Sequence, residues 1–161
     1  MKCTLYTEKF GEMVFTLYPE HAPLTVKNFE NTVKSGFYNG LAFCRLVEGY
    51  VIQGGSPDND IMTDSSWHIK GEFTANGVDN PLVHKRGAIS MARDDDYDTA
   101  GTQFFIVHQD AHKLDGRYAA FGYMDSGFET LDALASLPTH GAETWNKPIE
   151  MPIIQRIVIE D

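Results

Sequence analysis

Basic residues are scarce in this chain of 161 residues. Thirteen Lys and Arg stand against 23 Asp and Glu, which gives a formal net charge of -10. Binding to nucleic acid or to an anionic membrane depends largely on clustered Lys and Arg. The charge balance therefore argues against both kinds of partner, and we expect it to serve solubility.

Cysteine is rarer still, and long apolar runs are missing. Cys3 and Cys44 both fall within apolar, strand-like segments, so we expect two buried thiols rather than a disulfide. The first residues, MKCTLYTEKFGEM, contain neither the apolar stretch nor the cleavage site of a signal peptide. No apolar run approaches the length of a membrane span. These features predict a cytoplasmic protein, and the length and composition fit one globular domain.

Strand patterns dominate the residues that are present. A turn ending in Gly11 joins two segments rich in Thr, Tyr, Phe, Val and Leu, which predicts a hairpin of residues 2–7 and 12–18. The remaining strands are expected at 41–48, 50–53, 87–91, 102–107, 119–123 and 153–159.

Two helices interrupt the strands. Pro23 suits a first helical position, and Val26, Phe29 and Val33 recur at helical spacing, which predicts a helix from about Pro23 to Ser35. A second helix is expected after Ser126, where Ser126 and Glu129 fit a capping box, and it ends before Pro138. Eight strands with two distant helices predict a mainly β fold, a closed antiparallel barrel that leaves no exposed strand edge.

The segment LAFCRLVEGYVIQGG, residues 41–55, combines apolar residues with two isolated polar side chains. Alternation places Arg45 on the same face as Leu41 and Phe43, and Gln53 follows eight residues later. A guanidinium among apolar neighbours is costly unless it has partners or serves a ligand. Two interpretations are open on this segment alone: an edge-strand Arg whose head reaches water, or a group that binds a ligand.

Other polar clusters are less specific. Asp94, Asp96 and Asp98 have a spacing found in calcium loops, but no Gly follows and no Glu closes the loop. We therefore expect a solvated acidic loop; if the loop has a function, it would favour binding partners that carry Lys or Arg. His108 and His112 lack the glutamate of a zinc motif, and no GxSxG sequence occurs. No metal site and no cofactor are expected.

The most specific signal is a series of four segments, which read FCRLVEGYVIQGG, GAISMAR, AGTQFFIVH and LDGRYAAFG. Their order and spacing resemble those of the cyclophilins, the cyclosporin-binding class of peptidyl-prolyl cis-trans isomerases, and small bacterial members in particular. The resemblance runs through essentially the whole chain and implies a single cyclophilin-type domain over residues 1–161. It also implies an eight-stranded antiparallel barrel capped by a helix at each end.

The resemblance assigns roles to individual residues. Arg45 would donate to the nitrogen of the twisting X-Pro bond, and Gln53 would hold the substrate backbone or position Arg45. Alternation in 102–107 places Gln103 and Phe105 on one face, which suits a pocket wall. The implied substrate-binding set is Phe43, Tyr50, Val51, Ala92, Arg93, Gln103, Phe105, Lys113, Leu114 and Tyr118.

The chain departs from the family in ways that bear on ligands. Lys113 stands where many eukaryotic members carry a Trp that caps the drug site, so cyclosporin binding is expected to be weak. The expected partners are proline-containing peptides and unfolded or folding proteins, bound by a monomer. Two other functions remain open: a proline-peptide binding module with little turnover, and a hollow barrel that binds a small hydrophobic ligand.

Overall fold

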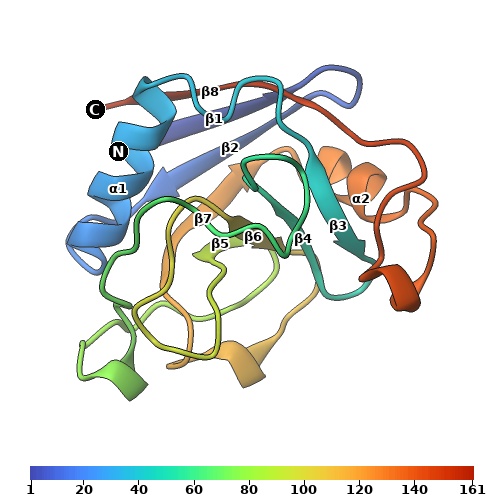
Figure 1. Ribbon diagram of the computed structural model, residues 1–161. Coiled ribbons are helices and arrows are strands. Elements are labelled where there is room, and N and C mark those ends of the chain that lie inside the picture. The colour runs from blue at the N-terminus through green and yellow to red at the C-terminus, as the bar shows by residue number, and fades with distance from the viewer.

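A single antiparallel sheet of eight strands forms the body of the computed structural model, which describes residues 1–161 (Figure 1). The strands run in the order β3-β4-β6-β5-β7-β2-β1-β8. Their bounds are β1 Lys2–Thr7, β2 Glu12–Leu17, β3 Phe43–Val47, β4 Val51–Gly54, β5 Ala88–Met91, β6 Phe104–Val107, β7 Ala120–Ser126 and β8 Ile154–Glu160. Every predicted strand is present, with ends that differ by a few residues. The mainly β fold with eight antiparallel strands is confirmed.

The two outer strands of the sheet, β3 and β8, approach each other without forming a ladder. One bridge, between Ala42 and Ile153, joins the chain beside them. The edge of β3 is otherwise covered by the segment that precedes β8, because the N–H of Phe43 donates to the carbonyl of Pro152 and the N–H of Leu46 to that of Asn146. The sheet is therefore a curled half-barrel, and the prediction of a closed barrel was overstated.

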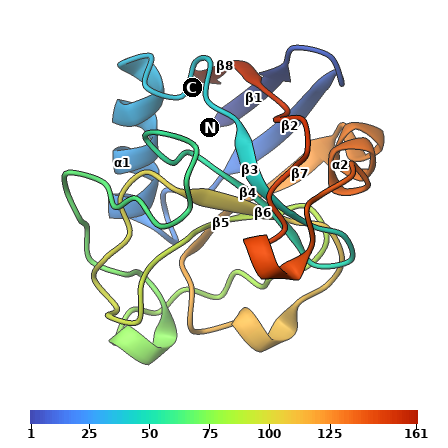
Figure 2. The same ribbon diagram turned by 45° about the vertical axis from the view of Figure 1, so that its right-hand side comes forward.

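The two helices lie at opposite ends of the half-barrel, as Figures 1 and 2 both show, and both contribute to its inner core. Helix α1, Pro23–Lys34, packs against β8 and matches the prediction to within one residue. Helix α2, Phe128–Ala135, packs against β2. The predicted capping box is wrong, because Ser126 pairs with Val14 as the last residue of β7 and Gly127, at φ +95°, takes the capping position. Three unpredicted 3-10 helices complete the fold: η1 Thr74–Asn76, η2 His112–Leu114 and η3 Ala142–Thr144.

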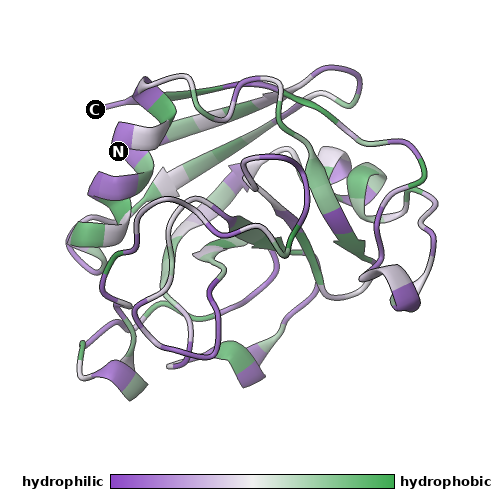
Figure 3. Cartoon of the chain, in the orientation of Figure 1, coloured by the Kyte–Doolittle hydropathy of each residue, from purple (hydrophilic) through white to green (hydrophobic).

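Aromatic side chains fill the inside of the half-barrel. The ring of Phe29, on α1, lies 5.4 Å from Tyr38, 5.6 Å from Phe104 and 5.1 Å from Phe121, measured between ring centroids. These rings belong to one cluster of 25 buried residues. Figure 3 shows the hydrophobic residues concentrated on the strands and the hydrophilic ones on the long loops. A filled interior argues against the hollow, ligand-binding barrel.

A buried carboxylate from a distant loop caps the start of α1. Glu72 is 3% exposed and accepts hydrogen bonds from the N–H of Leu24 at 3.2 Å, the N–H of Thr25 at 2.6 Å and the hydroxyl of Thr25 at 2.7 Å. Ala22, which precedes the helix, has no side chain able to cap it. Glu72, which is distant from α1 in the sequence, therefore acts as the N-cap by accepting hydrogen bonds from the free N–H groups of the first turn.

The two cysteines are unpaired and buried, as predicted. Burial raises the pKa of the Cys3 thiol to about 12. Burial is also the largest of several effects that raise the pKa of the Cys44 thiol to about 11. Both thiols are therefore unreactive at neutral pH. None of the helices combines the length and the apolar character needed to cross a membrane.

Candidate active site

Four side chains form a row across neighbouring strands. Arg45 on β3 is paired with Gln53 on β4, Gln53 with Phe105 on β6, and Phe105 with Ser90 on β5. Residues directly opposite each other in antiparallel strands share a face. The tight β3–β4 hairpin thus turns a spacing of eight residues in the sequence into direct contact between Arg45 and Gln53.

Phe43 lies on the other face of this hairpin. The register of β3 against β4 shifts between Phe43 and Arg45, so simple alternation does not hold there. Phe43 is fully buried in the core, with its ring 5.9 Å from that of Phe104. The predictions that Phe43 shares a face with Arg45 and lines the substrate site are therefore wrong.

A cavity of about 130 Å³ lies beside Arg45 and Gln53. Phe105 and Tyr118 form one wall, with their rings edge to face at 5.8 Å. Within β6 the alternation holds, because Phe105 and Val107 face this side of the sheet and Phe104 and Ile106 face the core. The lining consists of Arg45, Tyr50, Val51, Gln53, Ala92, Arg93, Phe105, Leu114 and Tyr118. All nine belong to the set expected from the resemblance.

A chain of side-chain hydrogen bonds positions Arg45. Its Nη1 donates to Oε1 of Gln53 at 3.2 Å, and Nε2 of Gln53 donates to Oε1 of Gln103 at 2.8 Å. Gln103 in turn donates to the carbonyls of Ile61 and Thr63 in the long loop after β4. Nε of Arg45 is buried and has no partner. No carboxylate pairs with Arg45, so the cavity holds an uncompensated cation with an unused donor.

Arg93 forms the border of the cavity on the side of the β5–β6 loop. Its guanidinium donates to the carbonyl of Arg117 through Nε and Nη2, at 3.1 and 2.7 Å. It also stacks over the ring of Tyr118 at 4.4 Å from the centroid. No protein group pairs with the N–H or C=O of Arg93. The side chain is thereby fixed while the main chain stays free to pair with an extended peptide.

Lys113 reaches the same region from η2. Its Nζ lies 4.6 Å from the centroid of the Tyr50 ring, in a cation–π contact. Burial raises the pKa of the Tyr50 hydroxyl above its ordinary value, so it stays protonated. Lys113, a flexible cation, therefore lies at the edge of the cavity. By the resemblance described above, many eukaryotic members carry a rigid Trp at this position.

A second cavity, of about 90 Å³, adjoins the first across Gln53, Ala92 and Arg93, which line both. Its lining is largely polar and includes the carboxylates of Asp64 and Asp94. Asp64 is paired with His68 at 2.8 Å, whereas the carboxylate of Asp94 has no partner.

The acidic loop does not gather its carboxylates around one point. Asp98 accepts from the N–H of Gly71 at 3.0 Å and the amide of Asn76 at 2.8 Å, and these bonds, with that of Gly71 the larger, lower the pKa of its carboxyl. No group of three or more His, Cys, Asp or Glu side chains is placed to hold a metal ion.

Directly behind the wall of the first cavity lies a histidine that the sequence analysis did not single out. His84 is fully buried, and its ring stacks on Phe105 at 5.9 Å between centroids. Its Nδ1 lies 2.9 Å from Oδ1 of Asp115 and its Nε2 lies 2.9 Å from Oγ of Ser90. Because a carboxylate only accepts, Nδ1 carries the proton and Nε2 accepts from the Ser90 hydroxyl. No periodicity or motif connects these three residues, so the sequence held no signal for them.

The buried His84 predicts a loss of stability in mild acid. Burial lowers the pKa of its imidazole below the ordinary value of 6.5, and Asp115 offsets this only in part. The folded state therefore binds fewer protons than the unfolded state below about pH 6.5, and the free energy of unfolding falls as the pH drops from there. We expect the urea midpoint to fall between pH 7.5 and 5, and the fall to be smaller in His84→Phe. An equal fall in both proteins would contradict this.

The comparisons with known proteins agree with the geometry. The family model described as "Cyclophilin type peptidyl-prolyl cis-trans isomerase/CLD" matches residues 2–158. Peptidyl-prolyl cis-trans isomerase B of Bacillus subtilis is 43% identical over 122 residues, which cover 76% of this chain and 82% of the relative. A peptidyl-prolyl cis-trans isomerase of Helicobacter pylori is 41% identical over 133 residues, which cover 81% of this chain and 78% of the relative.

A solved structure extends the similarity to the whole chain. It is that of a cyclophilin-type peptidyl-prolyl cis-trans isomerase of Cryptosporidium parvum, crystallised in the presence of the dipeptide Ala-Pro. The two folds share a TM-score of 0.89 at 31% identity, and the match covers 100% of this chain and 99% of that chain. The chain therefore belongs to the cyclophilin-type peptidyl-prolyl cis-trans isomerases.

Proposed function

We propose that this chain catalyses rotation about X-Pro peptide bonds in the cavity beside Arg45. The observation that carries the proposal is the unused Nε donor of Arg45, buried next to an apolar wall that contains Phe105. Rotation of an X-Pro bond breaks amide resonance and returns a lone pair to the proline nitrogen. A planar, permanently charged donor at that nitrogen stabilises the twisted bond without a nucleophile or a proton transfer.

The other residues of the cavity bind the substrate and position Arg45. Phe105, with Val51, Leu114 and Tyr118, encloses the proline ring in apolar surroundings. Gln53 holds Arg45 in place, and the free main chain of Arg93 pairs with the substrate backbone before the proline. The exclusion of water by the apolar wall strengthens the contact between Arg45 and the nitrogen.

We propose proline-containing peptides and unfolded or folding proteins as the substrates, a proposal supported by the apolar wall beside Arg45. Residues 1–161 would act as one domain and as a monomer. The two buried, unpaired thiols favour the reducing cytoplasm as the place of action. With Lys113 against Tyr50, cyclosporin binding would be weak, since no rigid aromatic group closes the cavity at that edge.

The experiment that tests the function measures the cis-to-trans rate of a short Ala-Pro peptide with and without the protein. Uncatalysed exchange takes tens to hundreds of seconds, so a clear acceleration is expected at micromolar protein. A folded protein that binds the peptide without accelerating exchange would support the alternative, a proline-peptide binding module.

We further propose that the second cavity favours Lys or Arg in the substrate segment before the proline. Asp94 offers an unpaired carboxylate there, and an exposed ion pair contributes about 0.2–1 kcal/mol. At low salt, kcat/KM should therefore be about two- to five-fold higher for a peptide with Lys two residues before the proline than for the same peptide with Glu at that position.

The substitution Asp94→Asn should remove this preference for Lys. Asp96→Asn serves as the matched control, because Asp96 belongs to the same exposed loop and does not line the cavity. Equal preference for Lys in wild type and Asp94→Asn would refute the assignment.

A further inference from the structure

His84 connects the parts of the molecule that form the proline cavity. Its ring lies behind Phe105, and Ser90, its partner on β5, stands opposite Phe105 in the sheet. On the other side it holds the η2 segment that carries Leu114. There the N–H of His84 donates to Oδ1 of Asp115 at 2.6 Å, and its carbonyl accepts from the N–H of Ala111 at 2.8 Å.

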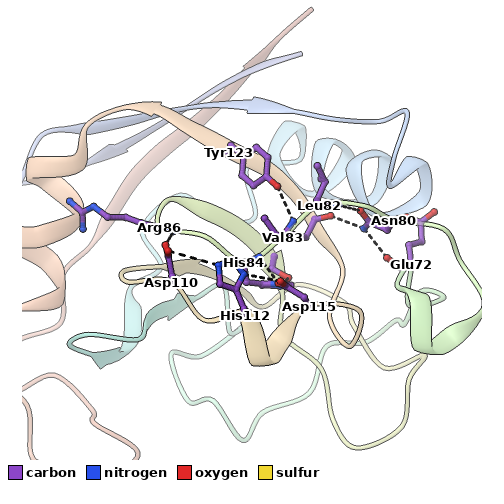
Figure 4. Close-up of polar contacts among 12 residues, drawn as sticks. Glu72, Asn80, Leu82, Val83, His84, Arg86, Asp110, His112, Asp115 and Tyr123 are labelled. Atoms are coloured by element: carbon purple, nitrogen blue, oxygen red, sulfur yellow. Dashed lines mark hydrogen bonds and ion pairs between the residues drawn. The ribbon is translucent and has the colours of Figure 1, made fainter.

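The loop that carries His84 is itself pinned along its length. The contacts begin at Asn80, whose amide donates to the carbonyls of Glu72 and Ala120, and Figure 4 shows the one with Glu72. The N–H of Val83 donates to the hydroxyl of Tyr123 at 2.8 Å, and the N–H of Arg86 donates to Asp110 at 2.8 Å. A loop held this closely can act as a rigid support for the side chain at its centre.

The three residues Ser90, His84 and Asp115 have the hydrogen-bond order of a hydrolytic triad, but they cannot act as one. Ser90 and His84 are both 0% exposed, and Phe105 lies between them and the cavity. A nucleophile must reach its substrate. We therefore consider a structural function, in which the hydrogen bonds of His84 to Ser90 and Asp115 fix the positions of β5 and of the η2 segment.

We propose that His84 is a positioning residue for the isomerase, which joins β5 to the η2 segment through Ser90 and Asp115 and so fixes Phe105 and Leu114 around the proline ring. The inference rests on the proposed function of the same cavity. Phe105 and Leu114 contact the proline in the ground state and in the twisted state alike. Loss of their support therefore weakens binding rather than the bond rotation itself, which depends on Arg45.

The test compares His84→Phe with wild type. Phenylalanine can keep the stacking on Phe105, but it removes both side-chain hydrogen bonds. We expect the dissociation constant of a short Ala-Pro peptide and the KM to rise about ten-fold, with kcat within about two-fold of wild type. A folded variant with the wild-type dissociation constant, or one that loses kcat at unchanged KM, would overturn the proposal.

A second variant keeps the test decisive if His84→Phe does not fold. Asp115→Ala removes the other end of the same contact on a partly exposed loop, and should also weaken peptide binding. If both variants fold, the loss of binding in the double mutant should be smaller than the sum of the two single losses, because both changes remove the bond between Nδ1 of His84 and Asp115. Peptide binding by Asp115→Ala at the wild-type dissociation constant would refute the proposal.

The matched control is His112→Ala. His112 contacts the other oxygen of Asp115 at 2.9 Å, but it is an exposed residue and does not touch Phe105 or Ser90. Its replacement should leave the dissociation constant unchanged. A loss equal to that of His84→Phe would mean that the charge balance of Asp115, not the buried link, controls the cavity.

A spectroscopic readout completes the design. The ring nitrogens of His84 should show Nδ1 protonated and Nε2 unprotonated in a nitrogen-15 spectrum at pH 7, with the signals assigned by their loss in His84→Phe. Addition of the Ala-Pro peptide should shift them, because the proline binds against the ring that His84 stacks on. Signals that stay unshifted at saturating peptide would count against the link. Since the dissociation constant does not depend on turnover, a wild type without isomerase activity would refute the proposed function but not this inference.

Discussion

Replacement of Arg45 by alanine should lower kcat/KM for an Ala-Pro peptide by about 10²–10³-fold, the range found when one preorganised donor to a transition state is removed. The reason is the position of its guanidinium, which has one bond to Gln53, a buried Nε without partner and no paired carboxylate. A charge-assisted hydrogen bond contributes roughly 1.5–3 kcal/mol in ordinary surroundings, and the water-excluding cavity strengthens it toward the roughly 2.7–4 kcal/mol that this loss requires, so activity should fall strongly without being abolished. The remaining acceleration would come from the dry pocket formed by Phe105 and its neighbours.

Arg45→Lys should lose nearly as much, because a lysine keeps the charge but not the planar set of donors that the guanidinium holds beside the cavity. The measurement is the exchange rate of the peptide, with folding checked by circular dichroism. Arg156→Ala is the matched control: Arg156 is exposed on β8, stacks on Tyr6 and has no connection with the cavity. Near-full turnover by folded Arg45→Ala would refute the role assigned to Arg45.

Replacement of Glu72 by alanine should lower the free energy of unfolding by about 2–4 kcal/mol, since it removes the cap of α1 and leaves buried donors without acceptors. Two of those donors are main-chain N–H groups at the first turn of the helix, and the third is the hydroxyl of Thr25, which is fully buried. For a domain of this size the melting temperature should fall by about 5–15 °C.

Glu129→Ala provides the comparison for Glu72. Glu129 also lies in the first turn of a helix, α2, but it is exposed and caps nothing. Its loss should cost no more than about 1 kcal/mol through the helix dipole. The measurement is the free energy of unfolding of wild type, Glu72→Ala and Glu129→Ala, by calorimetry or urea. Equal stability of the two variants would show that the buried contacts of Glu72 do not stabilise the fold.

The strands could be predicted because their information is local, whereas the nine cavity residues were expected from the resemblance of four ordered motifs to a known family. Alternation in 102–107 separated Phe105 from Phe104 correctly, and Pro23 marked the start of α1. The contact between Arg45 and Gln53 needs only a tight hairpin between their two strands. Each of these features depends on residues within a few positions of one another.

The features that the sequence analysis missed or misplaced depend on strand irregularities or on residues far apart in the sequence. Phe43 was misplaced because one irregularity in the β3–β4 register reverses the side to which a strand residue points. Glu72 reaches Thr25 across 47 residues, and His84 reaches Asp115 across 31. Long loops bring these groups together, and no periodicity records where a loop will place a polar side chain.

The covered edge of β3 has a consequence for the way in which other polypeptides can pair with the sheet. An extended polypeptide adds readily to any strand that offers a free row of N–H and C=O groups. Here the residues before β8 occupy that row, through the bonds that Phe43 and Leu46 make with Pro152 and Asn146. An extended chain therefore finds these main-chain groups of β3 already paired and cannot add to the sheet through them. The cover thus protects this edge of the sheet from edge-to-edge association with other extended chains.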